Sequence, residues 1–277
     1  MKSYKDKVCV ITGAASGMGR ALAVNLAKQG ARLALSDINE EGLAETMAMI
    51  GAGSGGGNMH MSDRLDMADA DAIAAYAPKV EAQLGPADFV FNNAGFARVG
   101  DFRHTTAEQY ESVMDVNFYG VVRMSKAFLE QLISTKGGLV NISSIFGIVG
   151  WPGQAHYCAS KFGVRGFSEV LSMEMEEHGV SVSCVHPGGV KTNVARNAPV
   201  DYVADPSVTK EQMDKNFDDN APTTPERAAE IILAGAARGD KRIMVGPDAK
   251  FMQLWSRIFP VRYRSFVKKR AQGLLSS

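Results

Sequence analysis

The sequence predicts an α/β fold, namely a single domain whose doubly wound sheet has about seven mainly parallel strands, with helices on both faces. Seven short apolar runs alternate with longer segments of helical periodicity, as expected for buried parallel strands joined by crossover helices. The chain of 277 residues is 45% hydrophobic and 22% charged, which is typical of a folded globular protein. No linker or internal repeat divides it, so one domain is expected.

The expected strands are short apolar runs bounded by turn-forming residues. They lie at residues 7–12, 32–36, 58–61, 88–92, 138–143, 180–185 and 242–245. Helices are expected where apolar residues recur every three or four positions. These segments are residues 18–29, 40–50, 69–84, 107–134, 155–178 and 225–236. The stretch from about 190 to 224 is polar and interrupted by prolines, which predicts a less regular loop over a binding site.

Charge is unevenly distributed along the chain, although the formal net charge is zero. Residues 250–277 contain seven Lys or Arg and no acidic residue, which leaves 23 basic and 30 acidic residues in 1–249. Apolar residues interleaved with these bases predict an amphipathic extension that packs on its own domain or on a neighbouring subunit. Contact with a membrane surface is the less favoured alternative. The acidic balance of residues 1–249 argues against a nucleic-acid partner.

The cysteines and histidines indicate neither a disulfide framework nor a metal site. Cys9, Cys158 and Cys184 share no close spacing, and the five histidines form no metal-ligand pattern, so we expect reduced thiols and no metal. The first residues lack the apolar core of a signal peptide, and no run reaches the roughly 18 apolar residues of a membrane span. A cytoplasmic protein is therefore expected.

Three glycines follow the first expected strand. Gly13, Gly17 and Gly19 in "TGAASGMG" lie where a strand gives way to a helix. Without Cβ atoms they let the backbone approach a pyrophosphate at the helix N-terminus. The G-x-x-x-G-x-G spacing differs from the G-x-G-x-x-G fingerprint, so an ordinary tight turn is the alternative.

An acidic residue at the end of the second expected strand supports the dinucleotide interpretation. Asp37 lies 18 residues after Gly19, where a carboxylate can accept hydrogen bonds from the adenosine ribose and repel a 2′-phosphate. It could equally cap the helix that follows. No Arg or Lys lies between Thr12 and Met18 or directly after Asp37. The sequence therefore predicts NAD(H) in preference to NADP(H).

Tyr157 and Lys161 are four residues apart in "YCASK" and so share one face of the expected helix. A free phenol has a pKa near 10, and an ammonium within about 4 to 6 Å favours the phenolate. The pair can therefore form a proton donor of lowered pKa. A packed Tyr beside a surface Lys is the alternative for the pair taken alone.

Five motifs together resemble the short-chain dehydrogenase/reductase family over roughly residues 5–248. They are the glycine turn, "NNAG" at 92–95, "NISS" at 141–144, "YCASK" at 157–161 and "PGG" at 187–189. The resemblance implies a Rossmann-type catalytic domain in residues 1–249, NAD as cofactor and a small-molecule alcohol or ketone as substrate. It also implies a homodimer or homotetramer built through the long fourth and fifth helices.

The resemblance implies four catalytic residues. Tyr157 would exchange a proton with the substrate oxygen, and Lys161 would lower its pKa and bind the nicotinamide ribose. Ser144 would polarise the substrate carbonyl, with Ser143 as the nearby alternative. Asn117 would hold a water in a proton relay, although a polar residue bonded to backbone in a helix interior is also possible.

The same resemblance implies cofactor contacts from the glycine loop, from the ends of strands and from the turn after the sixth strand. The residues are Gly13, Ala15, Ser16, Gly17, Met18, Gly19, Asp37, Ile38, Asp66, Met67, Asn93, Ala94, Gly95, Tyr157, Lys161, Pro187, Gly188, Val190 and Thr192. Asp66 competes with Asp63 and Asp69 in the same run, and all three could solvate a loop or cap the next helix.

The expected function is hydride transfer between NAD(H) and a secondary alcohol or ketone. An apolar substrate is indicated by Phe96, Ile145, Phe146, Val149, Trp151 and Phe217, several of which core packing explains equally well. A 3-oxoacyl-thioester reductase would share the catalytic residues but would usually require NADPH, against which Asp37 argues. A non-catalytic nucleotide-sensing or scaffold protein would lack a member of the catalytic set, and none is missing.

Overall fold

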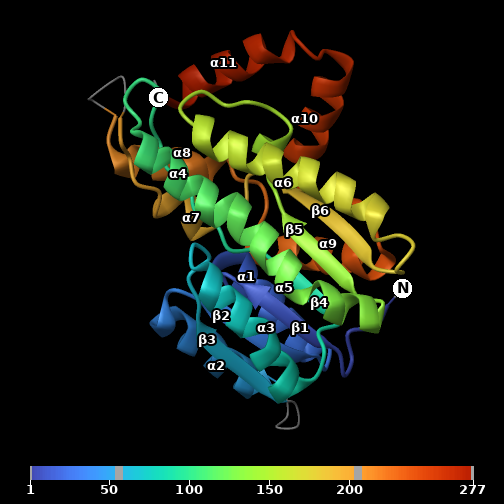
Figure 1. Cartoon of the computed structure of the whole chain (residues 1–277). Coiled ribbons are helices and arrows are strands. Elements are labelled where there is room, and N and C mark those ends of the chain that lie inside the picture. The colour runs from blue at the N-terminus through green and yellow to red at the C-terminus, as the bar shows by residue number, and fades with distance from the viewer. Residues whose placement is uncertain (1, 54–58, 203–207, 276–277) are drawn as a thin grey trace.

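The computed structural model describes residues 2–53, 59–202 and 208–275. Within them, a sheet of seven parallel strands runs through the molecule with helices on both faces (Figure 1). The strands are β1 (Val8–Thr12), β2 (Arg32–Asp37), β3 (His60–Arg64), β4 (Phe89–Asn92), β5 (Gly138–Ile142), β6 (Ser181–Pro187) and β7 (Arg242–Val245). Their order is β3-β2-β1-β4-β5-β6-β7. The predicted doubly wound α/β fold is confirmed.

Outside the stretch 190–224, seven α-helices of the described chain lie between the strands, and several of them begin at a side-chain cap that the sequence supplies. They are α1 (Gly17–Lys28), α2 (Glu40–Gly53), α3 (Ala70–Leu84), α4 (Ala107–Met114), α5 (Gly120–Thr135), α6 (Ala155–Glu174) and α9 (Pro225–Arg238). Asp69 caps α3 and Thr106 caps α4, each accepting a backbone N–H of the first turn. Thr224 caps α9, whose first residue is a proline, the helical position where proline's missing N–H costs nothing.

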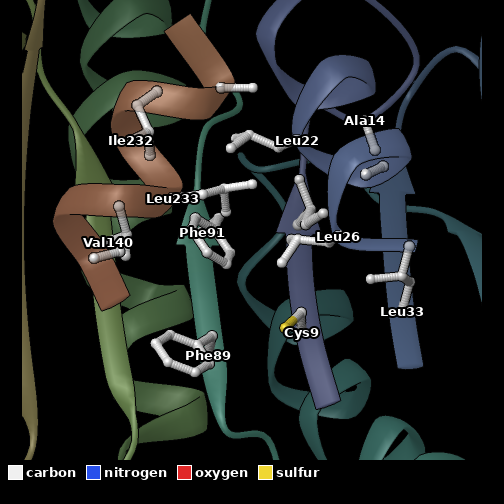
Figure 2. Packing of buried hydrophobic residues seen from close by; sticks show 14 of the residues in the cluster. Cys9, Ala14, Leu22, Leu26, Leu33, Phe89, Phe91, Val140, Ile232 and Leu233 are labelled. Carbon is white, nitrogen blue, oxygen red and sulfur yellow. The ribbon is translucent and has the colours of Figure 1, made fainter. Parts of the chain in front are cut away.

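One face of the sheet is covered by α1, α2 and α9. In Figure 2, Leu22 and Leu26 of α1 and Leu233 of α9 reach towards the sheet. The aromatic rings of Phe89 and Phe91 lie in the same cluster, with their centroids 6.2 Å apart. Burying such large apolar side chains supplies the main favourable free energy of folding. It also fixes α1 over β1, where the glycine turn begins.

The opposite face of the sheet is covered by α3, α5 and α6. Phe128 of α5 is fully buried there, with its ring edge-on to Tyr76 of α3 at 6.1 Å. The sheet order reverses between β1 and β4, and ligands of open α/β sheets bind at the carboxyl ends of the strands beside such a reversal. The motifs that follow β1, β4 and β5 all start at this edge.

Three segments differ from the sequence-based expectation. The third strand was expected at 58–61, but it lies at His60–Arg64, and residue 58 falls outside the described part of the chain. β3 is an edge strand that pairs with β2 from His60 to Arg64. Its exposed side chains, Ser62 and Arg64, are polar, so an apolar run locates it poorly.

The expected helix over 107–134 is helical throughout, but it contains a π-helical turn, η1 (Asp115–Tyr119), between α4 and α5. The stretch 190–224 is also more regular than expected. It holds α7 (Asn193–Arg196) and α8 (Lys210–Asn220), although residues 203–207 lie outside the described structure. Since α8 buries no side chain, it carries no apolar periodicity by which the sequence could reveal it.

The C-terminal extension forms two helices, α10 (Pro247–Ile258) and α11 (Tyr263–Leu275). They pack on the same chain through Met252 and Val267, which share a cluster with Ile148 and Val149. Among the described residues, no helix combines the length and apolarity needed to cross a membrane. Cys9, Cys158 and Cys184 are free and buried.

Phe128→Ala should lower the free energy of unfolding by about 3–5 kcal/mol, because it leaves a cavity where a fully buried ring packed. Urea denaturation followed by circular dichroism measures the change. Phe102→Ala is the matched control, since that ring is 73% exposed and its loss should change stability by less than about 0.5 kcal/mol. Equal losses in the two variants would contradict the described core.

Candidate active site

Three positions in the turn between β1 and α1 require glycine. Gly13 and Gly17 have φ angles of +67° and +54°, in the left-handed region that favours glycine. A Cβ at Gly19 would lie 2.0 Å from the carbonyl oxygen of Gly13. Ser16 precedes α1 without capping it through its side chain, which leaves first-turn N–H groups available to an anion. The cradle fits a pyrophosphate.

The turn after β6 closes against this glycine loop. A Cβ at Gly17 would lie 3.3 Å from the Cβ and Cγ2 atoms of Thr192, whose side chain is buried. Pro187 ends β6, and Val190 is buried and pairs with Thr223 in an isolated parallel bridge. The structure therefore brings the two predicted cofactor-binding turns together.

Asp37 ends β2 beside the glycine loop. Its carboxylate accepts the N–H of Ala15 at 2.9 Å and the N–H of Asn39 at 3.0 Å. The residue thus supports the glycine loop and the approach to α2. Asn39, rather than Asp37, caps α2 by accepting the N–H of Gly42 at 3.0 Å, and the ribose contact of Asp37 stays a prediction. Ile38, next to it, is 59% exposed, and such an apolar side chain can lie against the face of an adenine ring.

The three aspartates after the third strand have separate partners. Asp63 forms an ion pair with Lys79, and Asp69 caps α3 by accepting the N–H of Ala72 at 2.9 Å. Asp66 accepts the N–H of Ala68 at 2.9 Å and is half-buried. All three carboxylates therefore have a partner within the protein, and Asp66 as the adenine contact stays a prediction.

Met67 and Met18 contribute to packing. Met67 is buried, and a Cβ at Gly120 would lie 2.9 Å from the Met67 Cβ, so this side chain belongs to the core. Met18 packs against the cluster beneath α1. Any cofactor contact from these two residues must therefore come chiefly from their backbone atoms.

Thr12, which the sequence analysis missed, joins the end of β4 to the glycine turn. Its Oγ1 accepts the N–H of Asn93 at 3.1 Å and that of Ala94 at 3.0 Å. The side-chain amide of Asn93 donates to the carbonyl of Thr12 at 3.0 Å and to that of Gly13 at 3.2 Å. A buried threonine at the end of a strand has no sequence signal beyond its place before the first glycine.

The two serines of "NISS" take different positions. Ser144 is the N-cap of the short helix η2 (Ile145–Gly147) and accepts the N–H of Phe146 at 3.1 Å. Its hydroxyl also interacts with the phenol of Tyr157, an interaction that lowers the phenol's pKa. Ser143 instead donates to the backbone carbonyl of Lys161 at 2.8 Å. Ser144 is therefore the serine at the tyrosine.

Burial dominates the electrostatics of Tyr157 and Lys161. It raises the pKa of the Tyr157 phenol to about 12, although the Ser144 contact acts in the opposite direction. It lowers the pKa of the Lys161 ammonium to about 8. The Lys161 Nζ donates to the Ile142 carbonyl at 2.9 Å and lies 5.6 Å from the centre of the tyrosine ring. The net lowering of the tyrosine pKa expected from the sequence is therefore not found.

Asn117 lies in the π-helical turn η1 and is fully buried. Its amide donates to the Phe96 carbonyl at 2.8 Å, and its Oδ1 accepts the Phe96 N–H at 2.9 Å. A Cβ at Gly95 would lie 3.0 Å from this Oδ1 and 3.4 Å from the Lys161 Nζ. Asn117 and Lys161 therefore converge at Gly95, and π-helical turns of this kind are frequent at functional sites.

His186 and Asp248 support the site from outside the predicted set. His186 is fully buried, with Nδ1 3.0 Å from the Ser144 carbonyl, and burial lowers its pKa to about 4. Asp248 accepts the N–H of Gly189 at 2.6 Å. A Cβ at Gly188 would lie 2.2 Å from the Asp248 carboxylate. Nothing in the sequence marks either contact except the position of His186 before "PGG".

The arrangement places a hydroxyl, a phenol and a buried ammonium at the carboxyl ends of β4 and β5, next to a cradle shaped for a pyrophosphate. Such a set can position a substrate oxygen and exchange a proton with it. Within residues 2–53, 59–202 and 208–275, no three His, Cys, Asp or Glu side chains are grouped as a metal site requires.

Residues 7–202 match the family model for short chain dehydrogenases. The putative oxidoreductase SadH of Mycobacterium tuberculosis is 45% identical over 270 residues, covering 96% of each chain. A short chain dehydrogenase/reductase from Burkholderia phymatum, solved in complex with NAD, superposes with a TM-score of 0.83. It shares 25% identity and covers 95% of this chain and 97% of its own.

A short chain dehydrogenase from Mycobacterium paratuberculosis bound to NAD gives a TM-score of 0.75 at 26% identity, covering 88% of this chain and 97% of its own. The chain belongs to the short-chain dehydrogenase/reductase family. It is an oxidoreductase of that family.

Lys161→Met should remove a pH-dependent part of the stability. The pKa of Lys161 is about 8 in the folded protein against an ordinary 10.5, so between these values the unfolded chain holds more protons. The Lys161 contribution to the free energy of unfolding therefore rises with pH across this window. The free energy of unfolding of the wild type minus that of the variant, measured by urea denaturation, should therefore become more positive from pH 8 to 10.5.

Lys28→Met, at an exposed lysine in the last turn of α1, is the control for the loss of a charge. The difference between wild type and this control should stay constant over the same pH range. A constant difference for Lys161→Met as well would mean that the ammonium is not desolvated.

Proposed function

We propose that the protein is an NAD(H)-dependent oxidoreductase that interconverts a secondary alcohol and its ketone, with Tyr157 as general acid and base. The observation that carries the proposal is the convergence of Tyr157, Ser144 and Lys161 beside the glycine cradle. The Ser144 hydroxyl acts on the Tyr157 phenol and lowers its pKa, and Lys161 and Asn117 approach Gly95, which follows β4. A tyrosine and a lysine that merely packed on a helix surface would leave the lysine exposed, whereas Lys161 is 3% exposed.

The proton chemistry follows from the named groups. In the direction of oxidation, the Tyr157 phenolate takes the hydroxyl proton of the substrate, and in reduction the phenol returns it to the carbonyl oxygen. The Ser144 hydroxyl orients that oxygen by hydrogen bonding. In this structure the charge of Lys161 does not offset the burial that raises the phenol's pKa, so its proposed role is to bind the nicotinamide ribose, and Asn117 stands beside it as a member of the proposed proton path. When bound, NAD supplies the hydride chemistry at its nicotinamide ring.

The proposed cofactor follows from the polar groups that line the cradle. Gly13, Gly17 and Gly19 would hold the pyrophosphate at the N-terminus of α1. The Asp37 carboxylate, at the end of β2, would accept bonds from the ribose and repel a 2′-phosphate. The two NAD-bound relatives described above support the choice. The same carboxylate argues against the alternative of an NADPH-dependent 3-oxoacyl-thioester reductase.

An apolar substrate is supported by the surroundings of Tyr157. The ring of Phe146 stands edge-on to that of Tyr157, with centroids 6.2 Å apart, and stacks on Trp151 at 5.2 Å. Phe96 and Phe217 are also half-buried, whereas Val149 is fully part of the core. Phe146 and Trp151 therefore offer an apolar wall on one side of the phenol.

The assembly and location are further parts of the proposal. We propose a homodimer or homotetramer built through α5 and α6. α6 exposes the large apolar residues Phe162, Val170 and Met173, and an interface would bury them. We also propose that the protein acts in the cytoplasm.

Tyr157→Phe should lower kcat about 10²- to 10⁴-fold, because it removes the acid–base group. NADH binding, followed by fluorescence titration, should persist. The assay is NAD⁺ reduction across linear, cyclic, steroidal and aromatic secondary alcohols.

Tyr119→Phe is the control, since that side chain is 49% exposed. Near-normal activity of Tyr157→Phe would remove it from this role, and wild type that binds NADH without oxidising any alcohol would favour a nucleotide sensor.

Asp37→Ala should reduce the preference for NAD⁺ over NADP⁺ in kcat/KM by about 10- to 100-fold, because a charged hydrogen-bond acceptor and a repulsive charge are lost together. Steady-state kinetics with both cofactors measure this ratio. Asp71→Ala, at an exposed carboxylate in the first turn of α3, should leave the ratio unchanged. A wild-type enzyme that prefers NADP⁺ would contradict the assignment.

A further inference from the structure

The helix α10 has two apolar faces, and the body of the protein uses only one. Ala249 and Met252 point inwards and are buried. Phe251, Leu254 and Ile258 recur at helical spacing on a different side and are 51%, 59% and 56% exposed. Exposed large apolar residues that gather on one surface mark an interaction site, whereas isolated ones do not.

The second face continues across the turn onto α11. Phe266 of α11 lies 6.2 Å from Phe251 and 6.3 Å from Trp255, measured between ring centroids. Trp255 lies 4.6 Å from Phe259, and Val261 in the turn is 68% exposed. We call this surface the aromatic face. It comprises Phe251, Leu254, Trp255, Ile258, Phe259, Val261 and Phe266.

The aromatic face is surrounded by positive charge. Seven basic residues and no acidic residue lie between 250 and 277. All seven are exposed, and none forms an ion pair with a described acidic side chain. They are Lys250, Arg257, Arg262, Arg264, Lys268, Lys269 and Arg270. Figure 1 shows α10 and α11 together at one end of the molecule, far from α2 and β3.

Charge also distinguishes between the possible occupants of this face. Two copies of the chain related by a twofold axis would place the same patch against itself, and seven bases without an acid would then repel seven bases. An anionic bilayer instead attracts them, each base near such a surface contributing favourably. Aromatic and branched apolar side chains flanked by Lys and Arg are also the pattern of helices that lie in the membrane interface.

We propose that α10 and α11 dock the aromatic face on an anionic phospholipid surface. The inward side of the same helices packs on Ile148 and Val149 through Met252 and Val267. A pocket of about 470 Å³ opens beside them, lined by residues of α11 and of the segment that leads into α6. The proposal does not depend on the activity of the enzyme.

The test is co-sedimentation of the full chain with vesicles of phosphatidylcholine and phosphatidylglycerol in equal amounts, compared with vesicles of phosphatidylcholine alone. Wild type should sediment with the anionic vesicles, and added salt should release it. Leu254→Gln with Ile258→Gln should weaken this partition at least about tenfold, since two apolar side chains no longer enter the interface. Lys268→Gln with Lys269→Gln should weaken it about 25-fold, at about fivefold for each charge.

Met49→Gln with Met59→Gln is the matched control, because it removes two apolar side chains that are 50% and 57% exposed outside the extension. Its partition should equal that of wild type. Circular dichroism of each variant checks the fold. The proposal is overturned if the two double variants of the extension sediment with anionic vesicles as wild type does. It is also overturned if wild type does not bind the vesicles and these variants change the oligomeric state in sedimentation velocity. In the second case the face belongs to a subunit contact.

Discussion

The contact between Gly19 and the Gly13 carbonyl sets the distance between the first helix and the sheet. With 2.0 Å between that oxygen and the position of a Cβ, no larger residue can occupy position 19 without moving α1 away from β1. Thr12 and Asn93 then tie this turn to the end of β4 through four hydrogen bonds. The glycine turn is thus held to the end of β4 at the reversal of strand order.

Burial determines the protonation states of Tyr157 and Lys161 in the site. With the pKa of the Tyr157 phenol raised to about 12 and that of the Lys161 ammonium lowered to about 8, both groups carry their protons at neutral pH. The Ser144 hydroxyl lowers the pKa of the phenol by less than burial raises it, and the lysine gives a hydrogen bond to the Ile142 carbonyl. Under the proposed function, the protonated Tyr157 is the form that gives a proton to a carbonyl oxygen. Removing a proton from an alcohol requires a further positive charge or deprotonation of the phenol.

The candidate site could be proposed from the sequence because its parts are local, and the structure brings most of them together. The glycine turn, "NISS" and "YCASK" each lie within a few residues, and each follows or begins an element whose periodicity is strong. The sequence also separated Asp37 and Lys161 from the many other charged residues by their position relative to strand and helix. What it could not give was the balance of burial at Tyr157, which depends on residues brought together by the fold.

The elements and contacts that could not be predicted from the sequence share a physical cause. α8 buries no side chain and β3 is an edge strand with polar outward residues, so neither shows a full apolar pattern. The π-helical turn around Asn117 inserts one residue into a helix without changing its composition. His186, Asp248 and Thr12 act across distances of 42, 59 and 81 positions, and long-range contacts of this kind leave no local signal.

Asp248 connects the extension to the loop after β6, and composition alone would not reveal this contact. The helix α10 begins at Pro247, so the basic segment that starts at residue 250 begins inside this helix and not at a linker. The carboxylate in the first turn of that helix holds the Gly189 N–H. This hydrogen bond therefore joins the start of the extension to the loop after β6, and the last thirty or so residues continue a helix that is anchored beside a predicted cofactor-binding turn.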